Sequence, residues 1–542
     1  MTRNLTVREN EEWAETIITY HESIGYTFDR SSQSLARYLA YLLSSLTGSS
    51  YTIYNRSVKA LVIHLADYYT GFGLTTKNID FDDALALLNS SLLTGSGALQ
   101  PPSGFNWPFA TYPLKVRQTG AYAFTTNFVP EAYAAPALAG VVYWADVGAG
   151  SNTNPGSQAS PVKSIWKATQ LANAGGVPAT VMVKYNSAGY GRADGFTNTS
   201  TPVPNTVPIA YIAYGATFPA QGGIVDCWVG DALTWPGTPD GTFTNCYVAA
   251  RSNVSQIIDV SATDANGDYL RMVQVADAAT CNSTPNSWAQ VTTNIYVHRT
   301  NNDAVTNANT RAMLKATPNF VQDGTSKDVY LKGFNFQGGA AAAVACTAAA
   351  TMNFMAVNCS AKYAGDSATN VNGWKLDYMT GLAALVNCIG SQNEADGINT
   401  HWTPGGTPAL FTLTINCKGY NNGRDAVQSC NGLTSHDNAI NIEVTGEYYG
   451  NYGANVIPIN GNQMWCLGTY AHDSVGDVSH GGSTTPTDFQ TQATAVMWLQ
   501  NCRSAVSATS LLASNTSTIK TRNFLPGGGQ TPGAGGGTIT TF

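Results

Sequence analysis

The sequence predicts a mainly β protein, a parallel β-helix preceded by a small α-helical region. The first of three observations is an internal repeat: Val357-Asn358-Cys359 returns as Val386-Asn387-Cys388 and as Ile415-Asn416-Cys417, and a late copy follows as Gln500-Asn501-Cys502. A repeat of roughly 22 to 36 residues that holds short β-type runs and turn residues indicates one coil of a β-helix. Each coil would stack on the coil before it.

The second observation is composition. Only 11% of the 542 residues are charged, whereas 43% are hydrophobic and 53 are Gly. A globular chain is usually about one quarter charged. This composition is typical of a long β structure with many turns. The net charge of −7 and the scattered Lys and Arg residues argue against nucleic acid as a partner, because binding nucleic acid needs a basic surface.

The third observation is a change of pattern along the chain. Residues 1–95 are rich in Leu, and Leu35, Leu39, Leu42 and Leu46 have helical spacing. We therefore expect a small α-helical domain there. Residues 96–140 contain Gly and Pro clusters that break helices, and we interpret this segment as a connector that packs against the rest of the chain.

The β region is expected to span residues 141–525. It begins with a strand near Val141, a polar loop, a helix that opens at Ser160-Pro161, and a strand over Ala179–Val183. This order resembles the opening of the pectate-lyase-like β-helix proteins, whose helix covers the first coil; the resemblance implies a right-handed coil. Strands at Ser287–Val291 and Asn294–His298 are expected within less regular coils.

The end of the chain is rich in Gly. Residues 526–542 are interpreted as a flexible tail, although the last five residues could instead add a strand.

The cysteines and the acids that follow them share one spacing. An Asp follows seven or eight residues after each of four cysteines, as Asp366, Asp396, Asp425 and Asp473. Because coils stack about 4.8 Å apart, we expect these acids to form a column at one corner of the coil. The cysteines are interpreted as inward-facing free thiols, not as disulfides.

Histidines gather in the same part of the chain. Four of the seven lie between 401 and 480, among acids, as His401, His436, His472 and His480. The phrases around Asp396–His401, Asn421–Asp425 and Thr434–Asp437 resemble those of pectate-lyase-like β-helix proteins, including bacteriophage tailspikes. The resemblance implies a homotrimer in the virion tail, joined to other tail proteins through residues 1–95. It also implies that the β-helix binds a host surface polysaccharide.

The acids suggest a catalytic site. Glycoside hydrolysis normally needs two carboxyl groups. We take Asp396 and Asp425 as the pair, with Glu394 and His401 assisting. Contacts with substrate are assigned to five neighbouring residues: Trp402, Arg424, His436, Asp437 and Asp473. A polysaccharide depolymerase of the glycoside hydrolase type is favoured over a lyase, because basic residues are sparse. The same acids could instead be turn residues that accept backbone N–H bonds.

Other functions remain open. A non-catalytic structural or adhesive fibre protein and a free bacterial polysaccharide enzyme are the alternatives. No metal or cofactor is expected, because neither an EF-hand spacing nor a Cys-x-x-Cys pair occurs. The N-terminus shows no signal-peptide core and no run is long enough to cross a membrane, so we expect synthesis in the host cytoplasm.

Overall fold

The structure is a computed structural model that describes Ile63 and residues 99–542, apart from 200, 217, 219–222, 324, 347–351, 366–370, 402–409, 424–429, 477–484 and 533–535. The predicted helical domain at 1–95 therefore lies outside the described residues, except Ile63, which is helical and buried. No described helix combines the length and apolar character needed to cross a bilayer.

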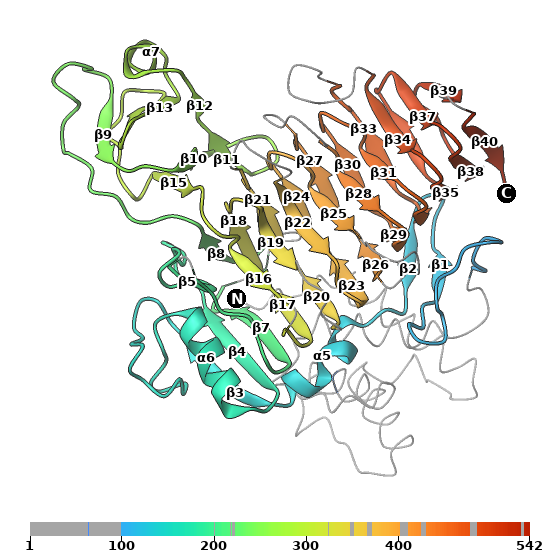
Figure 1. Ribbon diagram of the computed structural model, residues 1–542, viewed down its shortest axis with the longest axis horizontal. Coiled ribbons are helices and arrows are strands. Elements are labelled where there is room, and N and C mark those ends of the chain that lie inside the picture. The colour runs from blue at the N-terminus through green and yellow to red at the C-terminus, as the bar shows by residue number, and fades with distance from the viewer. Residues whose placement is uncertain are drawn as a thin grey trace, which may run out of the picture.

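Most of the described strands belong to three long parallel sheets, which run side by side along the molecule in Figure 1. From β16 to β36, successive strands enter the nine-stranded, twelve-stranded and eight-stranded sheets in turn, so that each of these repeats passes once through all three; β37 to β40 alternate between the nine-stranded and twelve-stranded sheets. The twelve-stranded sheet contains β3 (Val141–Ala145), β4 (Ala179–Lys184), β7 (Ile209–Tyr214), β17 (Val329–Lys332), β20 (Phe354–Val357), β23 (Gly381–Val386), β26 (Leu410–Ile415), β29 (Ile440–Val444), β32 (Gln463–Leu467), β35 (Val496–Gln500), β38 (Thr518–Arg522) and β40 (Thr538–Thr541).

The other two sheets follow the same order along the chain. The eight-stranded sheet contains β8 (Val225–Trp228), β18 (Phe334–Gln337), β21 (Ser360–Lys362), β24 (Ile389–Ser391), β27 (Lys418–Tyr420), β30 (Glu447–Tyr449), β33 (Tyr470–His472) and β36 (Arg503–Ala505). The nine-stranded sheet contains β16 (Phe320–Gln322), β19 (Ala342–Cys346), β22 (Asn372–Asp377), β25 (Ile398–His401), β28 (Leu433–His436), β31 (Val456–Pro458), β34 (Thr487–Thr491), β37 (Thr509–Ala513) and β39 (Gly529–Pro532).

The predicted repeat is in register. Val357, Val386 and Ile415 are partners on neighbouring strands, and the column continues through Val444 and Leu467. The register explains why the three-residue phrase recurs, since each copy fills the same place in its own repeat.

An asparagine corner follows this column. Asn358, Asn387 and Asn416 adopt φ values of 50°, 52° and 52°, a left-handed conformation that Asn tolerates better than most residues. The Asn387 amide donates to Oδ1 of Asn358 at 3.0 Å, and the Asn416 amide donates to Oδ1 of Asn387 at 2.8 Å. The turn between two sheets is thus tied to the same turn in the next repeat.

The cysteines that follow the corner are buried. All ten cysteines of the chain are free and buried, which agrees with the predicted thiols. The register of β21, β24 and β27 places Cys359, Cys388 and Cys417 at one position. Cys466, the cysteine seven residues before Asp473, lies elsewhere: it pairs with Glu443 inside β32.

The insertion between β8 and β16 corrects the expected run of irregular coils. Its strands form two mainly antiparallel sheets, and β13 and β14 match the predicted strands at 287–291 and 294–298. Figure 1 shows this unit projecting beside the parallel sheets. Its elements are β9 (Tyr247–Ala250), β10 (Val254–Thr263), β11 (Tyr269–Arg271), β12 (Val273–Gln274), α7 (Ala278–Ser283), β13 (Ser287–Val291), β14 (Asn294–His298) and β15 (Thr310–Leu314).

The tip of the insertion reaches back to the eight-stranded sheet. Ser391 Oγ donates to Oδ2 of Asp268 at 2.8 Å, and the Tyr449 hydroxyl donates to Oδ1 of Asn266 at 2.7 Å. These contacts hold the β10–β11 hairpin against that sheet.

Residues before β3 cover the outer face of the twelve-stranded sheet. This segment includes β1 (Val116–Gln118), β2 (Phe124–Thr126) and α5 (Pro130–Leu138). Phe105 packs edge-on against Trp465 and Trp498, with ring centroids 5.8 and 5.6 Å apart. The connector therefore packs on the sheet, as its aromatic content predicts.

One predicted helix begins later than expected. The helix expected at Pro161 is α6 (Ile165–Gly175), because the Ser164 side chain accepts a hydrogen bond from the Lys167 N–H and caps its first turn. A short hairpin, β5 (Thr197–Asn198) with β6 (Thr201–Pro202), follows β4.

The described residues of 526–542 do not form the predicted flexible tail; the alternative, an added strand in the last five residues, is confirmed by β40. Strands β39 and β40 pair in parallel with β37 and β38, which extends two of the parallel sheets. Gly content misled the prediction because Gly537 lies where an added Cβ would come within 2.1 Å of the Ala513 carbonyl oxygen. Close packing, rather than flexibility, accounts for a Gly at this position.

Candidate functional site

A row of ionisable side chains lies at the ends of three neighbouring strands of the nine-stranded sheet. Asp377, His401 and His436 are partners in register at the ends of β22, β25 and β28. Trp374 and Leu376 are two positions apart in β22, and both pack in the apolar core. Because side chains alternate along a strand, Asp377 and its row lie on the outer face of the sheet.

The residues directly after these strands turn the chain. Tyr378 and Asp437 follow β22 and β28 with φ values of 59° and 52°. The Tyr378 N–H donates to the His401 carbonyl oxygen at 2.9 Å, and the Tyr378 ring lies 5.3 Å from the His401 ring. The corner thus places an aromatic ring and a carboxylate beside the row.

His401 and Asp437 are in direct contact. Nε2 of His401 lies within hydrogen-bond distance of Oδ2 of Asp437, and the Asn460 amide donates to Oδ1 of Asp437 at 3.0 Å. The His436 ring lies 5.4 Å from the His401 ring, nearly perpendicular to it. Both His401 and Asp437 keep about a quarter of their side chains exposed, at 27% and 23%, so the pair is open to solvent.

Asp377 carries an unusual carboxyl group. Burial raises its pKa to about 6, while Lys375, 3.6 Å away, and His401 oppose the rise by favouring the charged form. Its Oδ1 atom is buried and accepts no hydrogen bond from the described residues. We name Lys375, Asp377, His401, His436 and Asp437 the Asp377 cluster.

Burial also lowers the pKa of His436, which keeps that ring neutral near pH 7.

Asp396, predicted as one of the catalytic pair, is enclosed by hydrogen-bond donors. Its side chain is fully buried; Oδ1 accepts from the N–H and the amide of Asn431 at 2.8 and 3.1 Å, and Oδ2 accepts from the Asn399 amide at 2.8 Å. A carboxylate enclosed in this way anchors the turn before β25. Its negative charge also contributes to the raised pKa of Asp377.

The expected column of acids does not form between the two of its members that the structure describes. Asp396 lies before β25 of the nine-stranded sheet, whereas Asp473 follows β33 of the eight-stranded sheet. Asp473 instead accepts a hydrogen bond from Nδ1 of His472 at 2.6 Å. The shared count from a Cys failed because Cys388 lies two residues after β23, whereas Cys466 lies inside β32, three positions earlier in its repeat.

The remaining predicted residues lie in three different settings. His401, His436 and Asp437 are brought together in the Asp377 cluster, while Glu394 is buried near Asp396, with 4% of its surface exposed. Three predicted residues lie outside the described residues: Trp402, Arg424 and Asp425.

Sequence reasoning missed Asp377 and Lys375. Their signal is an alternating pattern, since Trp374–Asp377 matches Ile398–His401 and Leu433–His436 when the apolar residues are aligned. That alignment puts Asp377 in the histidine position.

Chemically, the cluster joins a carboxyl with a raised pKa to a histidine–carboxylate pair, a combination suited to proton transfer. Among the described residues, no group of three or more His, Cys, Asp or Glu side chains is arranged to hold a metal ion.

Comparison with known proteins gives distant structural likenesses. No protein-family model matches the chain, and no curated protein matches it in sequence. A solved structure described as "Glycoside hydrolase" has 10% identity and a TM-score of 0.40, over 74% of this chain and 96% of that chain. A complex of XylC with xylose has 10% identity and a TM-score of 0.34, over 71% and 68%.

A third structure is a GH136 lacto-N-biosidase from Eubacterium ramulus, with 9% identity and a TM-score of 0.29 over 74% and 68% of the two chains. Any activity of this chain must therefore be inferred from its own side chains.

Proposed function

We propose that this chain is a polysaccharide-cleaving glycoside hydrolase, carried on a right-handed parallel β-helix, with the Asp377 cluster as its active site. The observation that carries the proposal is Asp377, a largely buried carboxyl whose pKa is raised to about 6 within a row of ionisable groups on an outer face. Perturbed carboxyl groups of this kind are characteristic of general acids.

The two carboxyl groups of the site have separate roles in this proposal. Asp377 donates a proton to the glycosidic oxygen, and Asp437, oriented by His401, accepts a proton from the attacking water. Their strands β22 and β28 are two strand spacings apart, about 10 Å between backbones. Asp437 bonds to His401 on the intervening β25, and we take this contact to bring the two carboxyl groups within that spacing. Inverting hydrolases separate their carboxyl groups by about 6.5–9.5 Å, so we propose inversion.

This assignment replaces the predicted pair of Asp396 and Asp425. Asp396 is saturated with hydrogen bonds from Asn399 and Asn431, which leaves it no exposed oxygen to offer a substrate. Asp377 takes the place of the acid, and Asp437, which was predicted to bind substrate, takes the place of the base.

The test is chromatography of surface polysaccharides from a panel of bacteria after incubation with the protein. Shortened saturated oligosaccharides from the parent, and none from Asp377→Asn, would support the proposal. Asp303→Asn is a suitable control, because Asp303 is an exposed acid of the insertion with 55% of its side chain accessible. Products with 4,5-unsaturated ends would indicate a lyase instead, and binding without shortening would indicate an adhesive protein.

We further propose that the chain acts as a bacteriophage tailspike, a homotrimer of the virion tail attached through residues 1–95. The support is the sequence resemblance described above. Sedimentation of the purified chain tests the trimer. Capture of tail proteins by the full chain, but not by a chain that lacks residues 1–95, tests the attachment. A monomer that captures no tail protein would argue for a free bacterial enzyme.

A further inference from the structure

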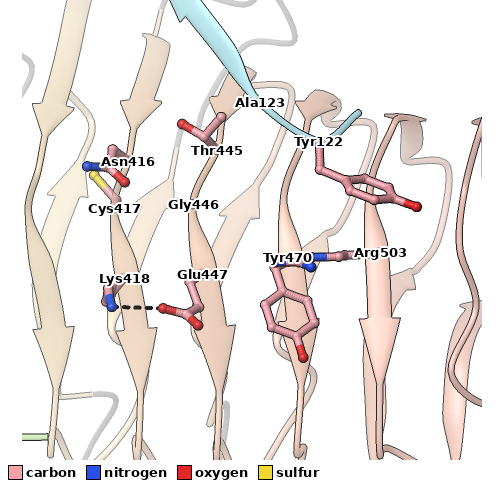
Figure 2. A pocket seen from close by; sticks show the side chains of 11 residues that line it. Tyr122, Ala123, Asn416, Cys417, Lys418, Thr445, Gly446, Glu447, Tyr470 and Arg503 are labelled. Carbon is pink, nitrogen blue, oxygen red and sulfur yellow. Dashed lines mark ion pairs between the residues drawn. The ribbon is translucent and has the colours of Figure 1, made fainter. Parts of the chain in front are cut away.

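A second row of outward side chains crosses the eight-stranded sheet. Lys418, Glu447, Tyr470 and Arg503 are partners in register, each the first residue of its strand in β27, β30, β33 and β36. At the spacing of neighbouring strands, such a row extends for about 14 Å. Figure 2 shows these side chains side by side on four strands, with Tyr122 of the β1–β2 connection beside them.

A pocket lies over this row. Its volume is about 340 Å³, and its lining includes all four residues of the row together with Tyr122. Ligand pockets of proteins begin at about 300 Å³. The pocket is on the eight-stranded sheet, whereas the Asp377 cluster is on the nine-stranded sheet, so the two sites are separate.

The charges of the pocket leave one cation without a counter-ion. Glu447 is paired with Lys418 at 2.8 Å, and Nε2 of His472 lies 3.5 Å from its other oxygen. These neighbours, His472 first, lower the pKa of Glu447 to about 2, so its charge is present and compensated. Among the described residues, no carboxylate lies within ion-pair distance of Arg503, whose side chain is exposed.

Aromatic rings hold the free guanidinium in place. The Arg503 guanidinium lies 4.1 Å from the ring centre of Tyr470 and 5.4 Å from that of Tyr122. A guanidinium stacked in this way keeps its N–H donors free for a planar anion, and a carboxylate accepts two of them in parallel. Aromatic rings offer apolar faces on which sugar rings pack, and Tyr122 lines the pocket beside Arg503.

We propose that this pocket is a second saccharide site that binds an acidic sugar unit, a uronate, through Arg503. The uronate carboxylate would receive two hydrogen bonds from the guanidinium, and its hydroxyl groups would bond to Glu447 and Lys418. The inference rests on the proposed function only in taking the ligand to be a saccharide. It implies an acidic polysaccharide held at one sheet and cleaved at another.

The test is equilibrium binding of galacturonate and glucuronate trimers to the full chain, measured by calorimetry or saturation-transfer NMR. Carboxyl-reduced trimers serve as neutral probes. We expect Arg503→Ala to weaken binding of one acidic trimer at least tenfold and Arg503→Lys to weaken it less. The matched control is Arg522→Ala, because Arg522 is also exposed and stacked on an aromatic ring, Phe542, at 4.4 Å. Binding should also weaken as salt is added.

The outcomes separate this proposal from the catalytic one. Asp377→Asn should retain acidic-trimer binding at the pocket even where cleavage is lost. Equal affinity for reduced trimers, unchanged affinity in Arg503→Ala, or no binding of either acidic trimer would each overturn the uronate site. None of these results depends on whether the Asp377 cluster cleaves a polysaccharide.

Discussion

His401 and Asp437 are hydrogen-bonded across neighbouring strand ends although 36 residues separate them in the sequence. The contact exists because β25 and β28 are adjacent in the nine-stranded sheet and Asp437 is the first residue after β28. If the pair acts as one unit, its two members should not contribute independently to catalysis.

We therefore expect His401→Ala and Asp437→Asn to lower kcat/KM by similar factors, on the order of 10² or more. The double variant should be no slower than the slower single variant by more than about threefold, since removal of either partner disables the pair. The measurement is the rate of reducing-end formation on the polysaccharide. Multiplicative losses would show that the two residues act separately.

The raised pKa of Asp377 predicts a pH dependence. A general acid works only while protonated, so kcat/KM should fall as the pH rises through about 6, where Asp377 ionises in the folded chain. Substitution of Lys375 by Met removes a cation that favours the ionised form, and it should move this limb to higher pH. If kcat/KM falls at the same pH in Lys375→Met as in the parent, Asp377 is not the group whose ionisation causes the fall.

Glu443 predicts a pH dependence of stability. It is fully buried among the core strands; burial raises its pKa from 4.5 to about 7, and hydrogen bonds from Thr414, Tyr448 and the Gly446 N–H oppose the rise. Below pH 4.5 both folded and unfolded chains hold the proton, and there is no cost. Between pH 4.5 and 7 only the unfolded chain releases it, so the cost to the free energy of unfolding grows to about 3 kcal/mol at pH 7 and stays at that value above it.

The measurement is urea unfolding of the parent and Glu443→Gln at pH 5 and pH 8. The parent should lose more stability than the variant between these two values, because the glutamine amide does not ionise. The difference between the two proteins isolates this residue from the other titrating groups. An identical loss in both proteins would mean that Glu443 does not keep its proton on folding.

The asparagine corner predicts a graded loss of stability. Asn387→Ala removes the hydrogen bond that the Asn387 amide donates to Asn358 and the one that its Oδ1 accepts from Asn416. It also puts Ala, which tolerates the left-handed conformation less well than Asn, at a φ of 52°. We expect a loss of about 2–3 kcal/mol from the two effects together. Asn387→Gly loses the same hydrogen bonds but accepts the left-handed φ, so it should lose about 1 kcal/mol less. Equal losses would show that backbone conformation does not limit this position.

Much of the fold was predictable from local pattern. The Val-Asn-Cys phrase marks a strand end, a left-handed corner and a buried thiol, and each of these needs a particular residue type within three positions. Such requirements are readable because they act over a short stretch of chain. The Gly-rich end was misread because the same glycines serve flexibility in one setting and close packing in another.

The site was only partly predictable. The sequence by itself determined that histidines and acids concentrate between 394 and 480, and His401, His436 and Asp437 were identified within that window. Only the tertiary structure brought Asp377 to the same row and enclosed Asp396 in hydrogen bonds. The reason is that successive repeats of the nine-stranded sheet are separated by 24 and then 35 residues. Strand pairing aligns their ends, and no constant spacing in the sequence records that alignment.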